Sequence, residues 1–313
     1  MTFEISNFKF QIAGFVTQNS KLKTQNGFAV AFLATMMLLC GCGKKTEPAA
    51  PPTDGRMRIV SLAPNLTEIL FALGLDAEIV GVTRHCNAPA AALTKRQIGT
   101  FWQPDIEAIV ALRPTLVVAE TFEQHRRLAE QLAQSGCRTL SVQIESVAQL
   151  FDGIVSMGQA VGRPSQAQQL VERLRAAIQT LQRRTEGRAK PKVLWVIQRQ
   201  PLRVAGTQTF VNELIEIAGG VNAIGKTLHA YPPIGDEEVI AAWPDVIIEP
   251  TDQPEQRQAQ QRSALSFYAA FRTLPAVRNG RIYVIDGDLV SRLGPRIEQG
   301  LKTIAACLEE RSL

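Results

Sequence analysis

The chain has few of the residues that catalysis and metal binding require. It contains three histidines, widely scattered, and the part after residue 42 holds the cysteines Cys86, Cys137 and Cys307, whose spacings are not those of a zinc site. A G-x-S-x-G elbow, a P-loop and paired metal ligands are all missing. These absences argue against an enzyme, and we expect no catalytic residue, no metal site and no cofactor.

Neither sign of charge dominates the chain. Lys and Arg number 34 and Asp and Glu number 29, which gives a formal net charge of +5. Because Lys and Arg form no dense cluster, a nucleic acid is not expected as a partner. Long apolar runs are also missing, since the run from Phe28 to Leu39 is too short to span a bilayer comfortably.

Residues 1–42 have the pattern of a secretory signal peptide, in which Lys21 and Lys23 precede the apolar run. The segment Leu39-Cys40-Gly41-Cys42 resembles a bacterial lipobox, which predicts a lipid on Cys42 rather than on Cys40. An ordinary cleaved signal is the alternative. We therefore expect a lipid-anchored protein in the periplasm or at the cell surface. The pattern leaves open which membrane holds the anchor, and the long leader leaves the start codon open.

The rest of the chain divides into a tether and three folded parts. Residues 43–56 are rich in proline and alanine, which favours a flexible, extended tether. An N-terminal α/β lobe is expected over 57–163, a connecting long helix over 164–187 and a C-terminal α/β lobe over 188–313. The helix prediction rests on an apolar stripe between Ser165, a candidate N-cap, and Arg184. A coiled-coil or surface helix is the alternative for that segment.

The stretch from Phe101 to Ala119 predicts a short helix followed by a buried strand. Asp105 can cap the helix, and Pro114 ends it, because the residue before a proline avoids the helical region. The expected strand, from Thr115, is almost entirely apolar, as buried parallel strands are. The apolar face of this helix is expected to comprise Ile106, Ile109, Val110 and Leu112.

The same pattern occurs again between Tyr231 and Ile248. Glu107 lies seven residues before Pro114, and Glu237 lies seven residues before Pro244. A second repeated motif is also present. Thr67-Glu68 followed by Gly74 corresponds to Asn212-Glu213 followed by Gly219. Two similar α/β units suggest two lobes that face each other, although βα units can also resemble one another by chance.

Two local features give further expectations. Asn65 can cap the first helix of the N-terminal lobe, with Glu68 in the capping-box position. A Cys86–Cys137 disulfide is possible, but the sequence cannot establish its geometry.

Several motifs together resemble the helical-backbone substrate-binding proteins of ABC importers, and among them most closely the cobalamin-binding proteins. These motifs are RIVSLAPNLTEILFALGL, GVTRHCNAP, IGTFWQPDIEAIVALRPTLVV, LPAVRNGRIYVIDGD and RLGPRI. The resemblance implies an α/β fold of two lobes joined by a single long helix, with the ligand in a cleft between them. Cobalamin or a related corrinoid would then be the ligand. The chain departs from the family at Ala218, where a cysteine would otherwise pair with Cys307.

The resemblance also implies the residues that contact the ligand. His85, Phe101 and Tyr231 match positions that lie against a macrocycle, and Trp102 is a further candidate. Aromatic faces can sandwich a large flat ring, with apolar area supplying most of the affinity. The segment that reaches the ligand's edge is Asp288, Leu289, Val290, Ser291 and Arg292.

Glu107 and Glu237 match the positions at which such proteins dock onto arginines of the membrane permease, which acts with its ATPase. The alternative is that both carboxylates only stabilise the dipoles of their own helices.

A second candidate ligand is a ferric siderophore or haem. His85 and Tyr231 could ligate iron, and Arg84 and Arg292 would suit an anionic chelate.

Overall fold

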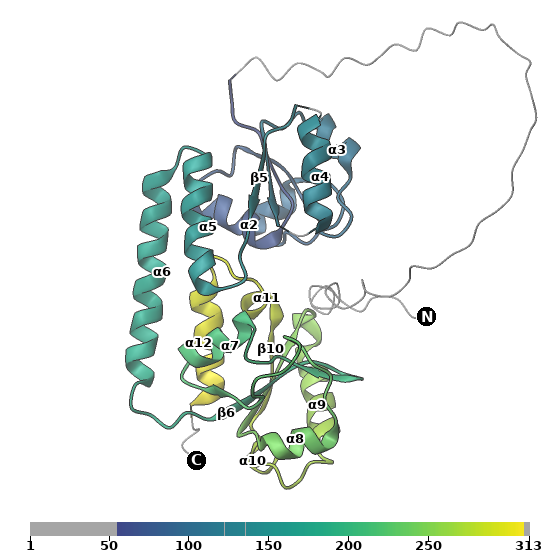
Figure 1. Ribbon diagram of the computed structural model, residues 1–313, viewed down its shortest axis with the longest axis vertical. Helices are drawn as coiled ribbons and strands as arrows, with labels where there is room; N and C mark the ends of the chain where they lie inside the picture. The colour runs from purple at the N-terminus through teal and green to yellow at the C-terminus, as the bar shows by residue number, and fades with distance from the viewer. Residues whose placement is uncertain (1–54, 122, 135, 310–313) are drawn as a thin grey trace, which may run out of the picture.

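Two α/β lobes lie one above the other along the long axis of the molecule (Figure 1). The computed structural model describes residues 55–121, 123–134 and 136–309. The predicted signal peptide, Cys42 and nearly all of the predicted tether lie outside these ranges. In the described part of the chain no helix has the length and apolar character that crossing a membrane requires. The predicted fold class, two α/β lobes joined by one long helix, is confirmed.

The N-terminal lobe contains a parallel sheet with the strand order β3-β2-β1-β4-β5. Successive side chains of a strand point to opposite faces, so Ile59 and Val118 face one helix layer while Val60 and Val117 face the other. Both faces are therefore buried. The strands are β1 (Ile59–Ser61), β2 (Ile79–Val82), β3 (Arg96–Gln97), β4 (Leu116–Glu120) and β5 (Thr139–Val142).

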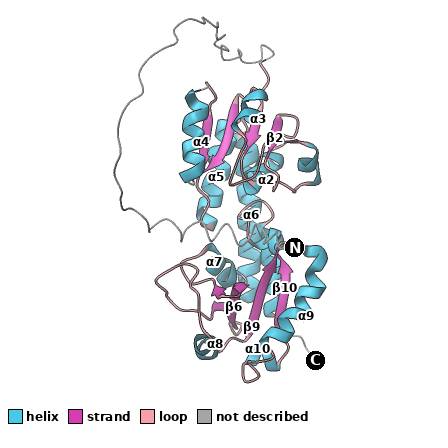
Figure 2. Ribbon diagram, turned by 90° about the vertical axis from the view of Figure 1, so that its right-hand side faces the viewer, coloured by secondary structure: helices cyan, strands magenta, loops and turns pink. Residues whose placement is uncertain are grey.

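Helices cover both faces of this sheet (Figure 2). Leu66 of α2 and Leu150 of α5 belong to the apolar layer on one face, and Ile109 of α3 and Leu128 of α4 belong to the layer on the other. The helices are α2 (Pro64–Ala72), the 3-10 helix η1 (Ala90–Thr94), α3 (Ile106–Ala111), α4 (Glu123–Gln134) and α5 (Val147–Ala160).

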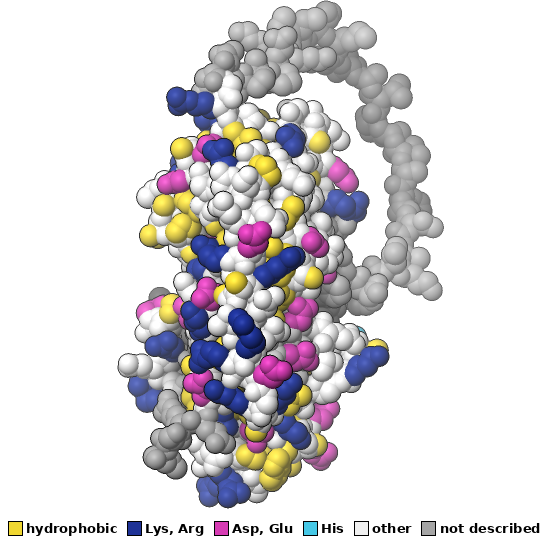
Figure 3. All heavy atoms as spheres, turned by 90° about the vertical axis from the view of Figure 1, so that its left-hand side faces the viewer, with side chains coloured by type: hydrophobic (Ala, Val, Ile, Leu, Met, Phe, Trp, Pro, Cys, Tyr) yellow, Lys and Arg dark blue, Asp and Glu magenta, His cyan; other side chains and the backbone are white. Residues whose placement is uncertain are grey.

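A long helix, α6 (Pro164–Thr185), connects the lobes and packs against α5, α7 and α12. Its 22 residues correspond to roughly 33 Å at 1.5 Å per residue. Its other side faces solvent, and Figure 3 shows Lys, Arg, Asp and Glu side chains interspersed on this side of the molecule. The buried stripe comprises Ala167, Leu170, Val171, Leu174, Ile178 and Leu181.

The C-terminal lobe contains a mixed sheet with the order β10-β9-β6-β7, and β8 pairs with β6. Only the β6–β7 pair is antiparallel among the strand pairs of the described residues. The strands are β6 (Lys192–Arg199), β7 (Leu202–Val204), β8 (Val221–Asn222), β9 (Val246–Thr251) and β10 (Ile282–Asp286).

Helices again cover both faces of the sheet. Trp195 and Ile248 face α7, α12 and the connecting helix, whereas Leu194 and Ile247 face α8, α9 and α10. The helices are α7 (Phe210–Ile217), α8 (Asp236–Ala242), η2 (Pro254–Gln256), α9 (Arg257–Tyr268), α10 (Pro275–Arg278), α11 (Gly287–Val290) and α12 (Ile297–Leu308).

The largest apolar cluster belongs to both lobes. It includes Ile59 and Leu150 from the N-terminal lobe, Leu174 from α6, and Trp195 and Leu301 from the C-terminal lobe. Since packed interiors resist deformation, this shared cluster, which we call the central core, limits how far the lobes can move apart.

The predicted repeat is present in the structure. Helices α3 and α8 occupy equivalent places, and each is followed by a residue with positive φ directly before a proline. These residues are Arg113, with φ of 47°, and Trp243, with φ of 48°. Positive φ is uncommon in residues other than glycine, so its occurrence at the same place in both halves supports a common origin of the two units.

The second repeated motif, which contains Glu68 and Glu213, also has a structural counterpart. Glu68, on α2, forms a bidentate ion pair with Arg296, which precedes α12, with N–O distances of 2.6 and 2.8 Å. Glu213, on α7, accepts a hydrogen bond of 2.8 Å from the backbone N–H of Val147, the first residue of α5. Each glutamate thus holds the start of the other lobe's last helix, where backbone N–H groups lack helical partners.

Asp105 caps α3 as predicted, by accepting a hydrogen bond from the N–H of Ala108. The expected cap at Asn65 is wrong, because α2 begins one residue earlier, at Pro64, whose fixed φ suits the first helical position. The Asn65 amide donates instead to Glu120 at 2.7 Å. The expected cap at Ser165 is wrong for the same reason, since α6 starts at Pro164.

Two further expectations need correction. Val110 does not share the buried face of α3, since 40% of it is exposed while Ile109 is fully buried. In a helix of six residues the buried stripe has room for few side chains.

Cys86 and Cys137 do not form the possible disulfide. Cys86 belongs to the central core, whereas Cys137 packs against the opposite face of the N-terminal sheet.

Glu68→Gln is expected to lower the free energy of unfolding by about 3 kcal/mol, because it leaves the Arg296 guanidinium without its counter-charge in a largely buried contact. Chemical denaturation followed by tryptophan fluorescence measures this loss. The matched control is Glu298→Gln, whose partner Lys302 is exposed, and it should cost no more than about 0.5 kcal/mol. Equal losses in the two variants would contradict the assignment.

Glu120 gives a pH-dependent expectation. Burial raises the pKa of Glu120 to about 7; nearby Glu145 adds to this rise and the hydrogen bond from Asn65 opposes it. Between pH 4.5, its usual pKa, and about 7, the folded protein holds a proton that the unfolded chain releases. The free energy of unfolding should therefore fall by about 3 kcal/mol as the pH rises across this window. Above pH 7, Glu120 should cause no further change.

Glu120→Gln is expected to remove that fall. Chemical denaturation at pH 4.5 and at pH 8 measures the free energy of unfolding of both proteins. The difference, variant minus wild type, should be about 3 kcal/mol larger at pH 8 than at pH 4.5. The exposed Glu130→Gln serves as the control and should track the wild type. A constant difference between wild type and Glu120→Gln at both pH values would refute the titration of this carboxyl group.

Candidate ligand-binding site

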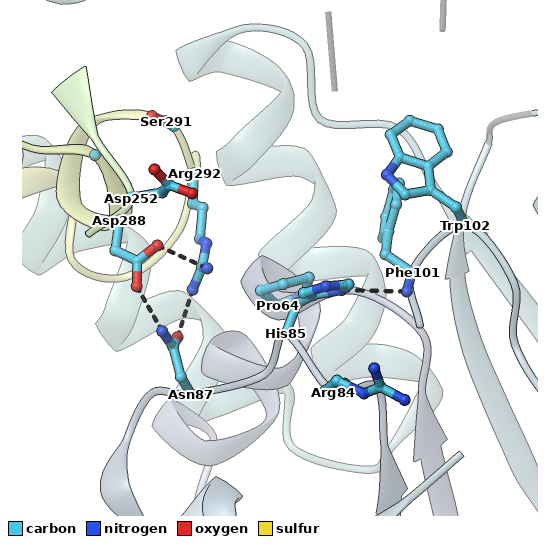
Figure 4. A pocket seen from close by; sticks show the side chains of 11 residues that line it. Pro64, Arg84, His85, Asn87, Phe101, Trp102, Asp252, Asp288, Ser291 and Arg292 are labelled. Carbon is cyan, nitrogen blue, oxygen red and sulfur yellow. Dashed lines mark hydrogen bonds and ion pairs between the residues drawn. The ribbon is translucent and has the colours of Figure 1, made fainter. Parts of the chain in front are cut away.

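A pocket of about 180 Å³ lies between the two lobes (Figure 4). Its walls are loops at the carboxyl ends of parallel strands, which is where open α/β sheets bind ligands. The N-terminal lobe contributes the loop after β2 and the loop before α3, and the C-terminal lobe contributes the ends of β9 and β10. The pocket is lined by Pro64, Arg84, His85, Asn87, Phe101, Trp102, Asp252, Gly287, Asp288, Ser291 and Arg292.

The aromatic part of the wall is held by a histidine from α4. Phe101 and Trp102 meet edge to face, with ring centroids 4.8 Å apart. The buried His125 ring packs edge-on against Phe101 at 4.7 Å, and its Nε2 lies 2.8 Å from the Phe101 carbonyl oxygen. The loop before α3 is therefore fixed from behind, so the aromatic side chains hold a defined position toward the pocket.

His85 has its ring oriented by the same loop. The backbone N–H of Phe101 donates to His85 Nδ1 over 3.4 Å, a long contact that Figure 4 shows as a dashed line. Burial lowers the pKa of His85, and the positive charges of Arg292 and Arg84 lower it further, against a smaller opposite effect of Asp288. The imidazole is therefore neutral at neutral pH. Because Nδ1 accepts, the proton resides on Nε2.

A set of polar contacts, which we call the polar bridge, joins the lobes beside the pocket. The Asn87 amide donates to Asp288 at 2.5 Å and accepts from Arg292 at 2.7 Å. Arg292 is also paired with Asp288 at 2.7 Å and lies 3.9 Å from Glu68. Asn87 comes from the N-terminal lobe and the charged pair from the C-terminal lobe, so the bridge spans the cleft (Figure 4).

The structure brings six of the predicted ligand-contacting residues into one pocket. They are His85, Phe101, Trp102, Asp288, Ser291 and Arg292. Leu289, Val290 and Tyr231 do not line it. Val290 is buried in the central core, and Tyr231 packs at the edge of that core, where burial raises the pKa of its phenol.

Sequence reasoning missed several residues of the site. Asn87, Asp252, Pro64 and Gly287 line the pocket, and His125 supports it. The signal for His125 was available, since it precedes Leu128 and Leu132 by three and seven residues and so lies on the buried stripe of α4. Asn87 had no comparable signal, because it stands in an irregular loop.

The predicted docking glutamates do not line the pocket. Glu107 and Glu237 are exposed near the starts of α3 and α8, toward opposite ends of the molecule (Figure 1). Within the described ranges, no group of three or more His, Cys, Asp or Glu side chains could hold a metal ion. The pocket thus offers aromatic surface, hydrogen-bond donors and acceptors, the Arg292–Asp288 ion pair, and the charged side chains of Arg84 and Asp252.

Comparison with known proteins places this architecture in a family. The family model described as periplasmic binding protein matches residues 59–289. An uncharacterized ABC transporter substrate-binding lipoprotein of Bacillus subtilis (strain 168), YvrC, is 27% identical over 91% of this chain and 97% of its own length. A vitamin B12-binding protein of Vibrio parahaemolyticus is 25% identical over 76% and 84% of the two chains, respectively.

Among solved structures, the periplasmic heme-binding protein RhuT from Roseiflexus sp. RS-1 superimposes with a TM-score of 0.71 at 28% identity, over 81% of this chain and 98% of that one. These relatives are named as binding proteins or as part of an ABC transporter rather than as enzymes, and the solved structure shares the fold of this chain. The chain therefore belongs to the periplasmic binding protein family, whose members bind the substrates of ABC transporters.

Proposed function

We propose that this protein is a lipid-anchored extracytoplasmic receptor that captures cobalamin or a related corrinoid and delivers it to the permease and ATPase of an ABC importer. The proposal rests mainly on His85. A histidine that ligates a metal usually donates its other ring N–H to an acceptor. In this pocket the other ring nitrogen, Nδ1, instead faces a backbone N–H donor, so the ring offers a donating N–H on Nε2 rather than a lone pair.

A donating imidazole suits a ligand that carries carbonyl or phosphate oxygens better than it suits iron. A corrinoid carries amide groups around its ring, and these both donate and accept hydrogen bonds. Asn87, Asp288 and Arg292 offer the complementary groups at the rim, and Phe101 with Trp102 offers apolar surface for the ring. The B12-binding relative is consistent with this ligand class.

Binding a macrocycle requires the pocket to widen. Sites for drug-sized ligands measure about 300–1,000 Å³, which exceeds the pocket between the lobes. The polar bridge joins the lobes at this cleft, and its three side chains can exchange their mutual hydrogen bonds for hydrogen bonds with water or ligand when the cleft opens. Modest lobe movement then suffices, because the central core stays intact.

An anionic ferric chelate or haem is the second candidate, and Arg84 favours it. This exposed side chain lines the pocket and carries a positive charge that could pair with propionate or siderophore oxygens. Tyr231 is a poor iron ligand in this arrangement, because it lies outside the pocket wall and burial raises the pKa of its phenol. The proposal therefore ranks haem below a corrinoid.

The anchor and the partner complete the proposal. Cys42 would carry the lipid and keep the protein at the membrane, in line with the lipoprotein named among its relatives. Glu107 and Glu237 would dock onto arginines of the permease. Their helices do not depend on them for capping, since Asp105 caps α3 and Glu238 bonds to the Gly235 N–H at the start of α8.

Titration with cyanocobalamin, haemin and a ferric siderophore, followed by visible absorption, is the direct test. The purified protein is expected to bind cyanocobalamin with a Kd of about 1 μM or tighter, which corresponds to about −8 kcal/mol. His85→Ala should weaken this binding by about ten-fold, the effect of one lost hydrogen bond, whereas His85→Gln keeps a donor and should weaken it by less than about three-fold.

The same two variants separate the candidates. If haem iron is bound by His85, both His85→Ala and His85→Gln abolish the ligation spectrum of haemin, because neither alanine nor glutamine replaces the imidazole. Such a spectrum in the wild type, lost in both variants, would reject the corrinoid proposal. So would the absence of corrinoid binding in the micromolar range.

Reversal of both docking charges tests the delivery step. In Glu107→Lys/Glu237→Lys the affinity for ligand should stay within about two-fold of the wild type, because both residues lie outside the pocket. ATP-driven uptake in cells should be lost, since lysines would repel the arginines of the permease. The control is Glu130→Lys/Glu255→Lys, a reversal of two exposed charges elsewhere on the two lobes. Uptake at the wild-type rate in the doubly reversed variant would exclude docking through these residues.

A further inference from the structure

The two exposed glutamates each have an apolar neighbour on the same helix face. Val110 follows Glu107 by three residues on α3, and Ile240 follows Glu237 by three residues on α8. Residues three apart on a helix are neighbours on its surface. Val110 is 40% exposed and Ile240 is 45% exposed, although both are β-branched apolar residues that would otherwise be expected inside.

The exposure of this pair is duplicated along with the repeat. Val110 lies four residues before Pro114, and Ile240 lies four residues before Pro244. The other large apolar side chains that are exposed among the described residues have no exposed apolar equivalent in the opposite lobe under the same alignment. They are Leu93, Val221, Leu228, Trp243 and Leu265.

The carboxylates beside them are not used within the molecule. In the part of the chain that the structure describes, neither Glu107 nor Glu237 forms a side-chain hydrogen bond or ion pair, whereas neighbouring Asp105 and Glu238 satisfy the N–H groups at the helix starts. An unpaired carboxylate next to an exposed aliphatic side chain is complementary to a partner surface that has a cation beside an apolar depression.

We propose that Glu107 with Val110, and Glu237 with Ile240, form two equivalent docking patches, in which the aliphatic side chain supplies affinity and the carboxylate supplies orientation. The occupant is the membrane permease of the importer, so this inference rests on the proposed function and adds an apolar component to it. Helices α3 and α8 lie toward opposite ends of the molecule (Figures 1 and 2), so one partner that meets both patches must span both lobes.

The division of roles follows from the physics of interfaces. Charges at an interface rim mainly steer approach and fix orientation, whereas desolvated apolar side chains contribute most to the lifetime of a complex. Two copies of the same patch match a partner that presents two equivalent subunit surfaces. A single protein of small size would meet only one patch and would have no use for the duplication.

The test compares Val110→Ser/Ile240→Ser with Leu265→Ser, which removes an apolar side chain of similar exposure, 43%, from α9. Docking to the permease–ATPase complex, purified from the source organism and held in nanodiscs, is measured by biolayer interferometry, with cyanocobalamin titration and thermal unfolding run in parallel. The double variant should dock about ten-fold more weakly, mainly through faster dissociation, and bind ligand like the wild type. Leu265→Ser should dock normally.

Salt dependence separates the two components. Raising the ionic strength should weaken docking of the wild type and of the serine variant by the same factor, because both keep the carboxylates, and should barely affect Glu107→Gln/Glu237→Gln. A second variant, Val110→Ala/Ile240→Ala, removes most of the apolar side chains but keeps high helix propensity. It should dock as weakly as the serine variant, which would show that the loss does not come from perturbed helices.

Three outcomes would overturn the inference. Wild-type docking by both the serine and the alanine variants would remove the apolar component while leaving the proposed function intact. An equal loss in Leu265→Ser would show that any exposed apolar residue has this effect. A wild-type protein that binds cyanocobalamin but does not dock onto the complex would overturn both the patches and the proposed delivery step.

Discussion

The contact between Glu68 and Arg296 is the constraint on which the arrangement of the lobes depends. A carboxylate from the first helix of one lobe holds the residue that precedes the last helix of the other, and Glu213 does the same in the opposite direction through the N–H of Val147. Together with the central core, these contacts fix where the loops at the strand ends meet. The pocket is a consequence of that fixed meeting, because its two walls come from different lobes.

Within the pocket, one backbone N–H decides much of the chemistry. By donating to His85, the amide of Phe101 directs the imidazole proton toward the ligand side, and His125 in turn holds the Phe101 carbonyl. The His85 and His125 rings are therefore both oriented by main-chain groups of Phe101. No residue of the duplicated α3 and α8 helices lines the pocket, so under the proposed function capture and delivery would use different parts of the molecule.

Much of this architecture was predictable because it depends on local rules. The proline after each short helix, the cap at Asp105 and the stripe of α6 are determined by residues close in sequence. The cap at Ser165 and the burial of Val110 were local errors, but most of what was missed concerns contacts between distant segments. The Asn65 amide N–H donates to Glu120 from 55 positions away, and Asn87 meets Arg292 from 205 positions away. Neither partner follows from spacing, and the omission of Tyr231 from the pocket wall likewise depends on how the lobes meet.

The central core has a consequence for how the chain folds. Its apolar residues are drawn from both lobes and from the helix that connects them, so neither lobe contains a complete hydrophobic interior of its own. Although the molecule has two sheets, we expect this shared core to make the two lobes unfold together rather than as two autonomous domains. A gene fragment that ended within α6 would encode a half that keeps the helices on both faces of its sheet but lacks the part of the central core supplied by the C-terminal lobe, so its apolar residues on that side would be exposed until the two halves assembled.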